Sequence, residues 1–324
     1  MKQVKLSFVI PCYRSEKTIS AVLDEIKTTV AKKDNYTYEV ITVNDSSPDQ
    51  VLSVLKEESA SDRYLKVLDL AKNCGKHAAL MAGYAYAEGD IIISVDDDGQ
   101  CPVNQLWKLL EPLEQGYDIS IAQYSAKKQS TFKNFGSFVN AKMTQILLKK
   151  PKELQLSNFS AMKKFVCAEI LKYQNPYPYI DGLFLRTTGR IANVPMEERE
   201  RQAGSSGYTL IKSLNLWLNG FTAFSVLPLR FATVLGISFS VVGFLFGLWT
   251  IIRKIFNPDI MAGYSSLMAV VLFVSGILMM MLGLIGEYIG RIYISINNSP
   301  QYVIREAINV NNELPKGNGH DKKS

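Results

Sequence analysis

Two long apolar runs in the last third of the chain constrain its fold more than any other feature. Residues 231–252 carry no charge, and residues 267–289 carry acidic charge only at Glu287, near their end. A helix of about 20 apolar residues is long enough to cross the hydrocarbon core of a bilayer. We therefore expect two transmembrane helices, residues 231–252 and residues 267–289, joined by a short extracytoplasmic loop over 253–266.

Two spans place both ends of the chain on one side of the membrane. Residues 1–8 contain no long apolar segment of the kind found in a secretory signal. The positive charges give only a weak signal, because Arg253 and Lys254 in the loop stand against four basic residues on the other side. We expect a large cytoplasmic domain over 1–208 and a cytoplasmic C-terminal tail over 290–324.

Short apolar strands alternate with helical patterns in the first part of the chain. Such alternation is typical of an α/β fold with a mainly parallel sheet and helices on both of its faces. The expected strands cover residues 6–10, 38–43, 65–70, 91–95 and 118–122, and the expected helices cover 15–30, 50–58 and 78–87.

Polar residues follow three of these strands, at what should be one edge of the sheet, where ligands of open α/β sheets collect. The three groups are Pro11–Glu16, Asn44–Asp49 and Asp96–Gln100. Asp96 and Asp98 can converge on one hard cation, Mg²⁺ or Mn²⁺, while Asp97 turns away, and a diphosphate is the natural ligand of such a cation. The alternative is an acidic turn that caps a helix opened by Pro102.

A nucleotide at this edge would be bound without the common phosphate-binding loops. No G-x-G-x-x-G follows the first strand and no G-x-x-x-x-G-K-[ST] is present, so neither a dinucleotide oxidoreductase nor a P-loop enzyme is supported. Tyr13 can pack on a ring, and Asp45 can accept hydrogen bonds from a base or a ribose. A loop tyrosine and a helix cap are the alternative roles of these two residues.

Composition argues against several other classes of site. The net charge of +6 is modest and its lysines lie near aromatic residues, which suits an anionic membrane surface and makes nucleic acid a weak candidate. The four cysteines have no C-x-x-C spacing, so neither a zinc site nor a disulfide framework is indicated, and a reducing compartment fits. A histidine base could come only from His77 or His320.

Two segments before the first apolar run have the pattern of membrane-surface helices. Over 127–150, lysines alternate with apolar residues at helical spacing, although an ordinary surface helix has the same pattern. Over 209–230, an apolar stripe predicts an amphipathic helix in the membrane interface. The spans carry G-x-x-x-G spacings that permit close helix contact within a subunit or in a homo-oligomer, or that face lipid by chance. These pairs are Gly243 with Gly247 and Gly286 with Gly290.

Six short motifs occur in a characteristic order along the chain. They are Val9–Tyr13, Asn44–Asp49, Asn73–Lys76, Asp96–Gln100, Arg201–Tyr208 and Gly286–Tyr293. In this order, and combined with two spans, they resemble the motifs of membrane-anchored family 2 glycosyltransferases. The branch they resemble transfers a sugar from a nucleotide to a polyprenyl phosphate, as in dolichyl-phosphate mannose synthase and bacterial undecaprenyl-phosphate glycosyltransferases. The resemblance covers nearly the whole chain except its tail.

The resemblance implies a GT-A-like catalytic domain with three overlapping sets of site residues. The implied catalytic residues are Asp96, Asp98 and Arg201, and the implied ligands of Mg²⁺ or Mn²⁺ are Asp96, Asp98 and Gln100. The implied nucleotide-sugar contacts are Pro11, Tyr13, Glu16, Asp45, Lys76, Asp96 and Asp97. The implied contacts to the acceptor phosphate are Lys128, Lys133 and Arg201.

The chain also departs from the pattern that it resembles. Arg14 and Ser15 stand where the family often has Asn-Glu, so the acidic contact to the nucleotide falls to Glu16 or is absent. Asn158 stands where some relatives have an aspartate, so a base at that position has no counterpart here. Asp181 is either a turn residue, the favoured interpretation, or a contact to sugar or acceptor.

The expected activity is inverting transfer of a sugar from a nucleoside-diphosphate sugar to undecaprenyl phosphate, for cell-envelope glycans at a bacterial inner membrane. A UDP-sugar is favoured by the habit of the family. One alternative is transfer to a growing polysaccharide or lipid-linked glycan, but the chain lacks the Gln-x-x-Arg-Trp motif and the extra spans of such synthases. A second alternative is a catalytically silent membrane scaffold or nucleotide-sugar sensor. The intact carboxylate pair, Asp96 and Asp98, argues against it.

Overall fold

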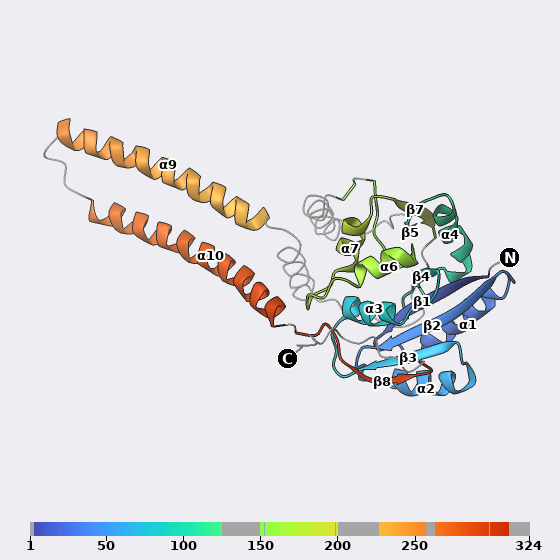
Figure 1. The fold of residues 1–324 in the computed structure, drawn as a ribbon. Helices are drawn as coiled ribbons and strands as arrows, with labels where there is room; N and C mark the ends of the chain where they lie inside the picture. The colour runs from blue at the N-terminus through green and yellow to red at the C-terminus, as the bar shows by residue number, and fades with distance from the viewer. Residues whose placement is uncertain are drawn as a thin grey trace, which may run out of the picture. The chain divides into compact units, whose positions relative to one another are not determined.

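An open α/β sheet forms the larger of the two units into which the chain divides (Figure 1). We describe it from a computed structural model, which defines residues 3–124, 150–151, 153–197, 199, 227–256, 263–297 and 299–310. The first unit consists of Met1–Tyr208 and Asn298–Ser324, and the second consists of Thr209–Asn297.

Within the described residues the sheet has eight strands in the order β7-β5-β6-β4-β1-β2-β3-β8. Strands β4, β1, β2 and β3 run parallel to one another, and β7 runs parallel to β5, while β6 and β8 are antiparallel to their neighbours. The expected mainly parallel sheet is therefore confirmed. The bounds are β1 Val4–Cys12, β2 Tyr36–Asn44, β3 Leu65–Leu70, β4 Ile91–Ser94, β5 Ile119–Tyr124, β6 Ser160–Lys163, β7 Ile191–Met196 and β8 Ile304–Ile308.

Helices cover both faces of this sheet, as the alternating side chains of β1 require. Leu6 and Phe8 point into a core with apolar residues of α1, α2 and α4. Val9 points to the other face, where α3 approaches so closely that a Cβ on Gly83 would lie 2.3 Å from Val9 Cγ1. The helices of this unit are α1 Ile19–Val30, α2 Val51–Ser61, α3 Lys76–Ala85, the short η1 Val103–Gln105, α4 Leu106–Glu114, α6 Lys164–Ile170 and α7 Ile180–Thr187.

Helix α1 begins later than the sequence predicts. Ser15 was the expected start, but its carbonyl accepts the N–H groups of Thr18 and Ile19 in a turn, and the helix begins at Ile19. The Thr18 hydroxyl donates to the carbonyl of Asp97 at 2.6 Å, a long-range bond that a local pattern cannot indicate. The difference matters because this turn belongs to the site.

The residues that follow the second apolar run return to the sheet. Strand β8 pairs antiparallel with β3, and the adjacent Asn309, at φ 56°, donates from Nδ2 to the carbonyls of Ser59 and Leu65 at 2.8 and 3.0 Å. These bonds satisfy carbonyl groups at and beyond the end of α2, which have no partner within the helix. The expected tail over 290–324 thus contains an edge strand that the sequence analysis did not predict.

The second unit contains two helices of membrane-spanning length. Helix α9, Leu227–Phe256, and helix α10, Tyr264–Ile296, have 30 and 33 residues, and their most apolar 18-residue windows have mean hydropathies of 1.9 and 1.7. By length and composition both can cross a bilayer. They contact each other at Phe239 and Phe273, whose ring centroids are 5.6 Å apart. The expected interfacial helix over 209–230 lies outside the described residues up to residue 226.

The G-x-x-x-G glycines take no part in this contact. A Cβ added at Gly243, Gly247, Gly286 or Gly290 would meet no atom within 4 Å among the described residues. Contact between subunits through these glycines stays a prediction.

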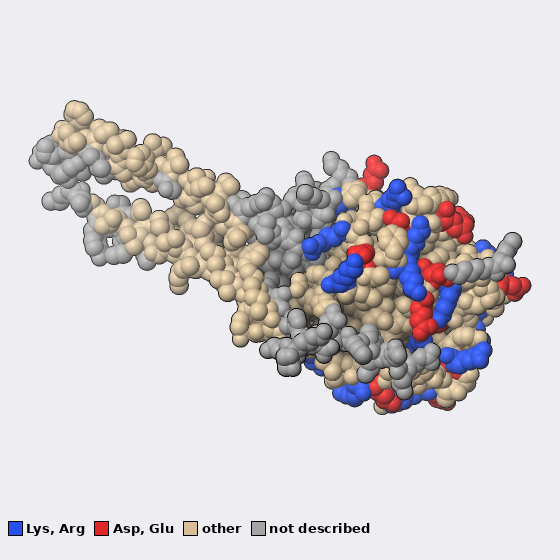
Figure 2. All heavy atoms as spheres, viewed as in Figure 1, with Lys and Arg blue, Asp and Glu red and all other residues tan. Residues whose placement is uncertain are grey.

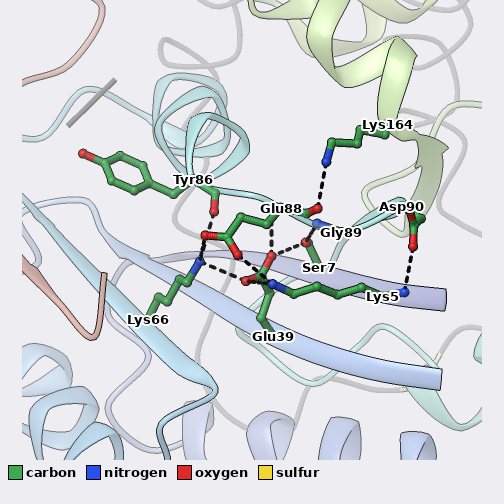
Figure 3. Close-up of polar contacts among 9 residues, drawn as sticks. All are labelled: Lys5, Ser7, Glu39, Lys66, Tyr86, Glu88, Gly89, Asp90 and Lys164. Atoms are coloured by element: carbon green, nitrogen blue, oxygen red, sulfur yellow. Dashed lines mark hydrogen bonds and ion pairs between the residues drawn. The ribbon is translucent and has the colours of Figure 1, made fainter. Parts of the chain in front are cut away.

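A partly buried ionic network connects the loop before β4 to the amino ends of β1, β2 and β3 (Figure 3). Glu39 Oε2 lies 2.9 Å from both Lys5 Nζ and Lys66 Nζ, and its Oε1 accepts the Ser7 hydroxyl at 2.6 Å. Glu88 binds the same two lysines, at 2.7 and 3.0 Å, and its backbone N–H donates to Glu39. Because the Glu39 and Lys66 side chains are only 4% and 9% exposed, each buried charge depends on the other.

Glu39→Gln is expected to destabilise the protein by about 3 kcal/mol, because it leaves the buried Lys66 with the half-exposed Glu88 as its charged partner and the Tyr86 carbonyl at 3.5 Å. The midpoint of thermal unfolding should fall by roughly 6–12 °C in detergent-solubilised protein. Lys172→Met is the control, since it removes an exposed pair with Glu169 that contributes less than about 1 kcal/mol. Equal shifts in the two variants would contradict the prediction.

Acid should remove the same stabilisation. Burial opposes ionisation of Glu39, but hydrogen bonds from Ser7, Lys5 and Lys66 outweigh it and lower its pKa, and hydrogen bonds from Lys5 and Lys66 lower the pKa of Glu88 to about 2. Carboxylates with lowered folded-state pKa values stabilise the fold fully above the unfolded value of 4.5 and lose this contribution as the pH falls through the folded value. The difference in unfolding midpoint between wild type and Glu39→Gln should therefore shrink steadily below pH 4.5.

Candidate active site

The three polar groups expected at one edge of the sheet do lie at the same edge. They follow β1, β2 and β4, which run parallel, and the register pairs Cys12 with Asn44 and Val9 with Ser94. A fourth loop, after β3, joins them because Asn44 pairs with Asp69. Parallel strands with this register bring their carboxyl ends together, where α/β sheets bind ligands.

Asp97 holds the loop that follows β1. Its Oδ2 accepts the backbone N–H of Tyr13 at 2.9 Å, so its carboxylate is turned to the backbone of that loop. Burial raises the pKa of Asp97 to about 6. The Tyr13 side chain is 44% exposed beside the bond, with the Arg14 guanidinium 5.5 Å from its ring centroid. An exposed ring at this edge is available to pack on a base, and its contact to a nucleotide stays a prediction.

The loops after β1 and β2 are bound to each other reciprocally. Arg14 N–H donates to the Ser47 hydroxyl at 2.7 Å, and Glu16 N–H donates to Asp49 at 3.0 Å. In return, the Glu16 carboxylate accepts the N–H of Gln50 at 3.0 Å. Arg14 and Ser46 have φ values of 59° and 50°, a conformation that non-glycine residues seldom adopt, so tertiary contacts fix these loops. Pro11, another predicted contact, is buried at the end of β1.

Asp45 connects the loop after β2 to the loop after β3. Its Oδ1 accepts the N–H of Cys74 at 2.7 Å and its Oδ2 accepts the N–H of Gly75 at 2.9 Å, while its carbonyl accepts Asn73 Nδ2 at 3.0 Å. Burial raises the pKa of Asp45, although the two backbone bonds favour the charged form. The structure thus gives Asp45 a bracing role, and its contact to a base or ribose stays a prediction.

Asp96 lies between two side chains from distant parts of the chain. Lys76, at the start of α3, forms an ion pair with Oδ1, and Asn158 donates from Nδ2 to Oδ2 at 2.7 Å. The resemblance implies that Lys76 contacts the nucleotide and that Asn158 stands where some relatives have an aspartate. Only the fold shows that both side chains contact Asp96. Neither contact has a local sequence signal.

Asp98 and Gln100 complete the acidic loop. Asp98 Oδ1 accepts the N–H of Gln100 at 3.1 Å, and Gln100 Nε2 donates to the carbonyl of Arg199 at 3.4 Å. Gly99 between them has φ 75°, which favours glycine. The turn at Gly99 keeps the carboxylates of Asp96 and Asp98 and the side-chain amide of Gln100 on the same loop.

These donors fit a hard divalent cation only as part of a larger ligand set. Across the described ranges, no group of three or more His, Cys, Asp or Glu side chains could hold a metal ion. The available donors are oxygen atoms, as Mg²⁺ and Mn²⁺ prefer, and such ions commonly take only one or two carboxylates from the protein and the rest from phosphate and water. Asp96 already faces one cation, the Lys76 ammonium group.

Two titratable residues beside Lys76 have environments that sequence reasoning missed. His77 Nδ1 accepts the N–H of Ile180 at 3.5 Å and its ring packs edge-on against Tyr179, and burial lowers its pKa to about 4. His77 is therefore neutral at pH 7. Asp181 lies in the first turn of α7, and loss of solvent raises its pKa to about 6.

Several predicted residues cannot be placed. Arg201, Lys128 and Lys133 lie outside the described residues, as do most of the basic segment over 127–150 and the motif over 201–208. Their contacts to an acceptor phosphate stay predictions.

Comparison with known proteins shows the family of this chain. Residues 7–171 match the family described as Glycosyl transferase family 2, which covers the four loops above. The chain belongs to glycosyl transferase family 2. Residues 227–292 of this family member also match the GtrB C-terminal hairpin, so α9 and nearly all of α10 correspond to that hairpin.

Relatives of this family 2 chain match along almost its whole length. An uncharacterised glycosyltransferase of Bacillus subtilis, YkcC, is 32% identical over 96% of this chain and 97% of its own. The SfII prophage-derived bactoprenol glucosyl transferase of Shigella flexneri is 32% identical over 94% of this chain and 98% of its own. Among solved structures, mannosyl-3-phosphoglycerate synthase from Rubrobacter xylanophilus has a TM-score of 0.49 at 15% identity, over 66% of this chain and 70% of its own.

The backbone at Gly75 gives a test of the loop that Asp45 braces. Gly75 has φ 84°, and a Cβ there would meet no atom within 4 Å among the described residues, so Gly75→Ala changes backbone strain alone. We expect a loss of about 1–3 kcal/mol in unfolding free energy, because φ 84° with ψ 159° is a conformation essentially restricted to glycine. Gly189→Ala is the matched control, because its Cβ also meets no described atom and its φ is not positive. Thermal unfolding compares the two, and an equal effect in both would show that Gly75 tolerates a side chain.

Proposed function

We propose that this family 2 glycosyltransferase moves a sugar from a nucleoside-diphosphate sugar, with UDP favoured, to a polyprenyl phosphate and inverts the anomeric configuration. The observation that carries the proposal is the convergence of four loops, with Asp96 and Asp98, in a chain that also has two helices of membrane-spanning length. The bactoprenol glucosyl transferases among its relatives, which match nearly full length, support a polyprenyl acceptor and a hexose donor.

The donor occupies the edge of the sheet where the loops meet. The exposed Tyr13 ring packs on the base, and Pro11, Glu16 and Asp45 shape the loops around the nucleoside. Lys76 reaches the diphosphate from the start of α3, where the first N–H groups of the helix also favour an anion. Asp97 keeps the Tyr13 loop in place beneath them.

A divalent cation, Mg²⁺ or Mn²⁺, completes the donor site. Asp96, Asp98 and the Gln100 side-chain oxygen are the protein groups that would hold it. When bound, such an ion neutralises charge that develops on the departing diphosphate. Asn158 orients Asp96 through its 2.7 Å hydrogen bond, and Lys76 shifts from Asp96 to the diphosphate.

The acceptor phosphate acts as its own nucleophile. One of its oxygens attacks the anomeric carbon opposite the nucleoside diphosphate, and the new C–O bond forms as the bond to the leaving group breaks. The second pKa of a phosphate monoester is roughly 6, so the dianion is present at neutral pH without a strong base. This agrees with an amide at Asn158 and with the neutral, buried His77. Arg201, Lys128 and Lys133 are the proposed cationic contacts to this phosphate.

The membrane helices bring the catalytic unit to its lipid substrate. With α9 and α10 spanning the bilayer, the catalytic unit lies on the cytoplasmic face of a bacterial inner membrane, where nucleotide sugars are made. Helix length and composition support the spans, and the bactoprenol glucosyl transferases among the relatives support association with a membrane.

Transfer by the full chain in detergent is the direct test. With undecaprenyl phosphate, Mg²⁺ or Mn²⁺ and a panel of UDP- and GDP-sugars, we expect release of nucleoside diphosphate that requires both lipid and metal. Asp98→Asn should reduce turnover by at least about 100-fold, because it removes a charge next to the leaving group. Release without lipid, or with a glycan acceptor only, would contradict the proposal.

Metal binding alone tests the roles of Lys76 and Asp96. Because the Lys76 ammonium group competes with a cation for Asp96, Lys76→Met should tighten the binding of Mn²⁺ without nucleotide by on the order of tenfold. The same variant should weaken the binding of UDP. Lys163→Met is the control. Lys163 pairs with Asp118 beside the amino end of β4, at the edge of the sheet opposite the site, and its side chain is 33% exposed, as is that of Lys76. Titration followed by electron paramagnetic resonance of free Mn²⁺ measures both variants, and unchanged affinity in Lys76→Met would contradict the assignment.

A further inference from the structure

The strand that follows the membrane helices carries an arginine to the edge of the site. Strand β8 lies beside β3 (Figure 1), and Val303 accepts the N–H of Ala71 at 2.8 Å. Arg305 donates from one guanidinium nitrogen to the carbonyl of Ala71 at 2.9 Å and places the other 3.6 Å from Asp69 Oδ2. These contacts lie at the carboxyl end of β3, immediately before the Asn73–Lys76 loop.

Asp69 connects Arg305 to the loop after β2. Asp69 is 3% exposed, and its Oδ1 accepts the Asn44 side-chain N–H at 2.7 Å. Asn44 is equally buried, and its Oδ1 accepts the N–H of Ser47 at 3.2 Å. The Ser47 hydroxyl in turn accepts the N–H of Arg14. A continuous series of polar contacts therefore runs from β8 to the loops that follow β2 and β1.

The guanidinium, on a side chain that is 61% exposed, is the charged partner of a carboxylate whose side chain is 4% exposed. A buried carboxylate is costly unless it is both paired with a cation and hydrogen-bonded, and removal of one partner leaves part of that cost uncompensated. Without Arg305, Asp69 can regain solvation only by moving toward water, and Asn44 would lose the acceptor that fixes its amide. Ser46 needs such support, because its φ of 50° is costly for a residue with a side chain.

We propose that Arg305 is a positioning residue of the donor site, which acts through Asp69 and Asn44 on the loop 44–49. The segment after the second membrane helix is then part of the donor site and not a passive tail. The inference rests on the proposed function, since the loop serves a nucleotide sugar.

The same strand offers a matched control. Glu306 follows Arg305 and pairs with Lys56 of α2 at 2.7 Å, with 46% and 41% of the two side chains exposed. Glu306→Gln thus removes a charge from the same docked strand without a contact to the site. Any effect of a loosened β8 should occur in both variants, and an effect through Asp69 should occur only in Arg305→Gln.

Hydrogen exchange of the full chain in detergent tests the positioning without catalysis. Arg305→Gln should raise exchange of the peptide that spans residues 44–50 on the order of tenfold, and Glu306→Gln should leave it unchanged. Arg305→Lys should restore part of the protection. Equal exchange at 44–50 in wild type and Arg305→Gln would overturn the inference, whether or not the protein transfers a sugar.

Kinetics provide the second measurement. Arg305→Gln should raise the KM for the nucleotide sugar about tenfold and leave kcat and the KM for the lipid within about twofold. Glu306→Gln should change none of them. A loss of kcat with an unchanged donor KM, or equal changes in both variants, would overturn the inference while leaving the transferase proposal intact.

Substitution of Arg305 in an Asp69→Asn background covers the case in which Arg305→Gln alone folds poorly. Asp69→Asn keeps an oxygen that can accept the Asn44 N–H but needs no cation, so Arg305→Gln should have little further effect on exchange or donor KM in that background. Independent effects of the two substitutions would overturn the inference. Full wild-type protection at 44–50 with no transfer to any acceptor would instead contradict the proposed function alone.

Discussion

The site depends on hydrogen bonds from backbone N–H groups to side-chain carboxylates and hydroxyls at one edge of the sheet. Asp97 binds the loop after β1, Asp45 binds the loop after β3, and Ser47 joins the loops after β1 and β2. Each bond satisfies a backbone donor that would otherwise be unpaired where the strands end. The arrangement is possible because parallel strands in register bring four carboxyl ends to one place.

The two ends of this sheet use charge for different purposes. At the amino ends, Glu39, Lys66 and their neighbours neutralise one another within a closed network (Figure 3), which fixes the loop that enters β4. At the carboxyl ends, Asp96 and Asp98 face the site with one lysine beside them. On the face that Figure 2 shows, basic and acidic side chains are intermixed over the described surface of this unit, whereas the described part of the hairpin is almost free of charge. The charges at the amino ends are paired within their network, and at the carboxyl ends Asp96 is paired with Lys76.

Much of the fold was predictable from local pattern. Strands at 38–43, 65–70 and 91–95 and the apolar runs at 231–252 and 267–289 each lie within an element of the structure or within one residue of its end. Local apolar period and run length encode these elements directly. The start of α1 at Ile19 and the strand β8 were not predicted, because both depend on partners that are distant in the sequence, Asp97 and β3.

The sequence by itself determined the class of the fold, the three polar loops and the acidic pair, because the hydrophobic period and the residues of each motif are properties of short segments of the chain. Only the tertiary structure decided which side chains meet. It placed Lys76 and Asn158 on Asp96, turned Asp45 to the backbone of Cys74 and Gly75, and brought Arg305 to Asp69. These contacts join residues 20 to 236 positions apart, and they form because sheet register and edge pairing, and not sequence spacing, set the distances.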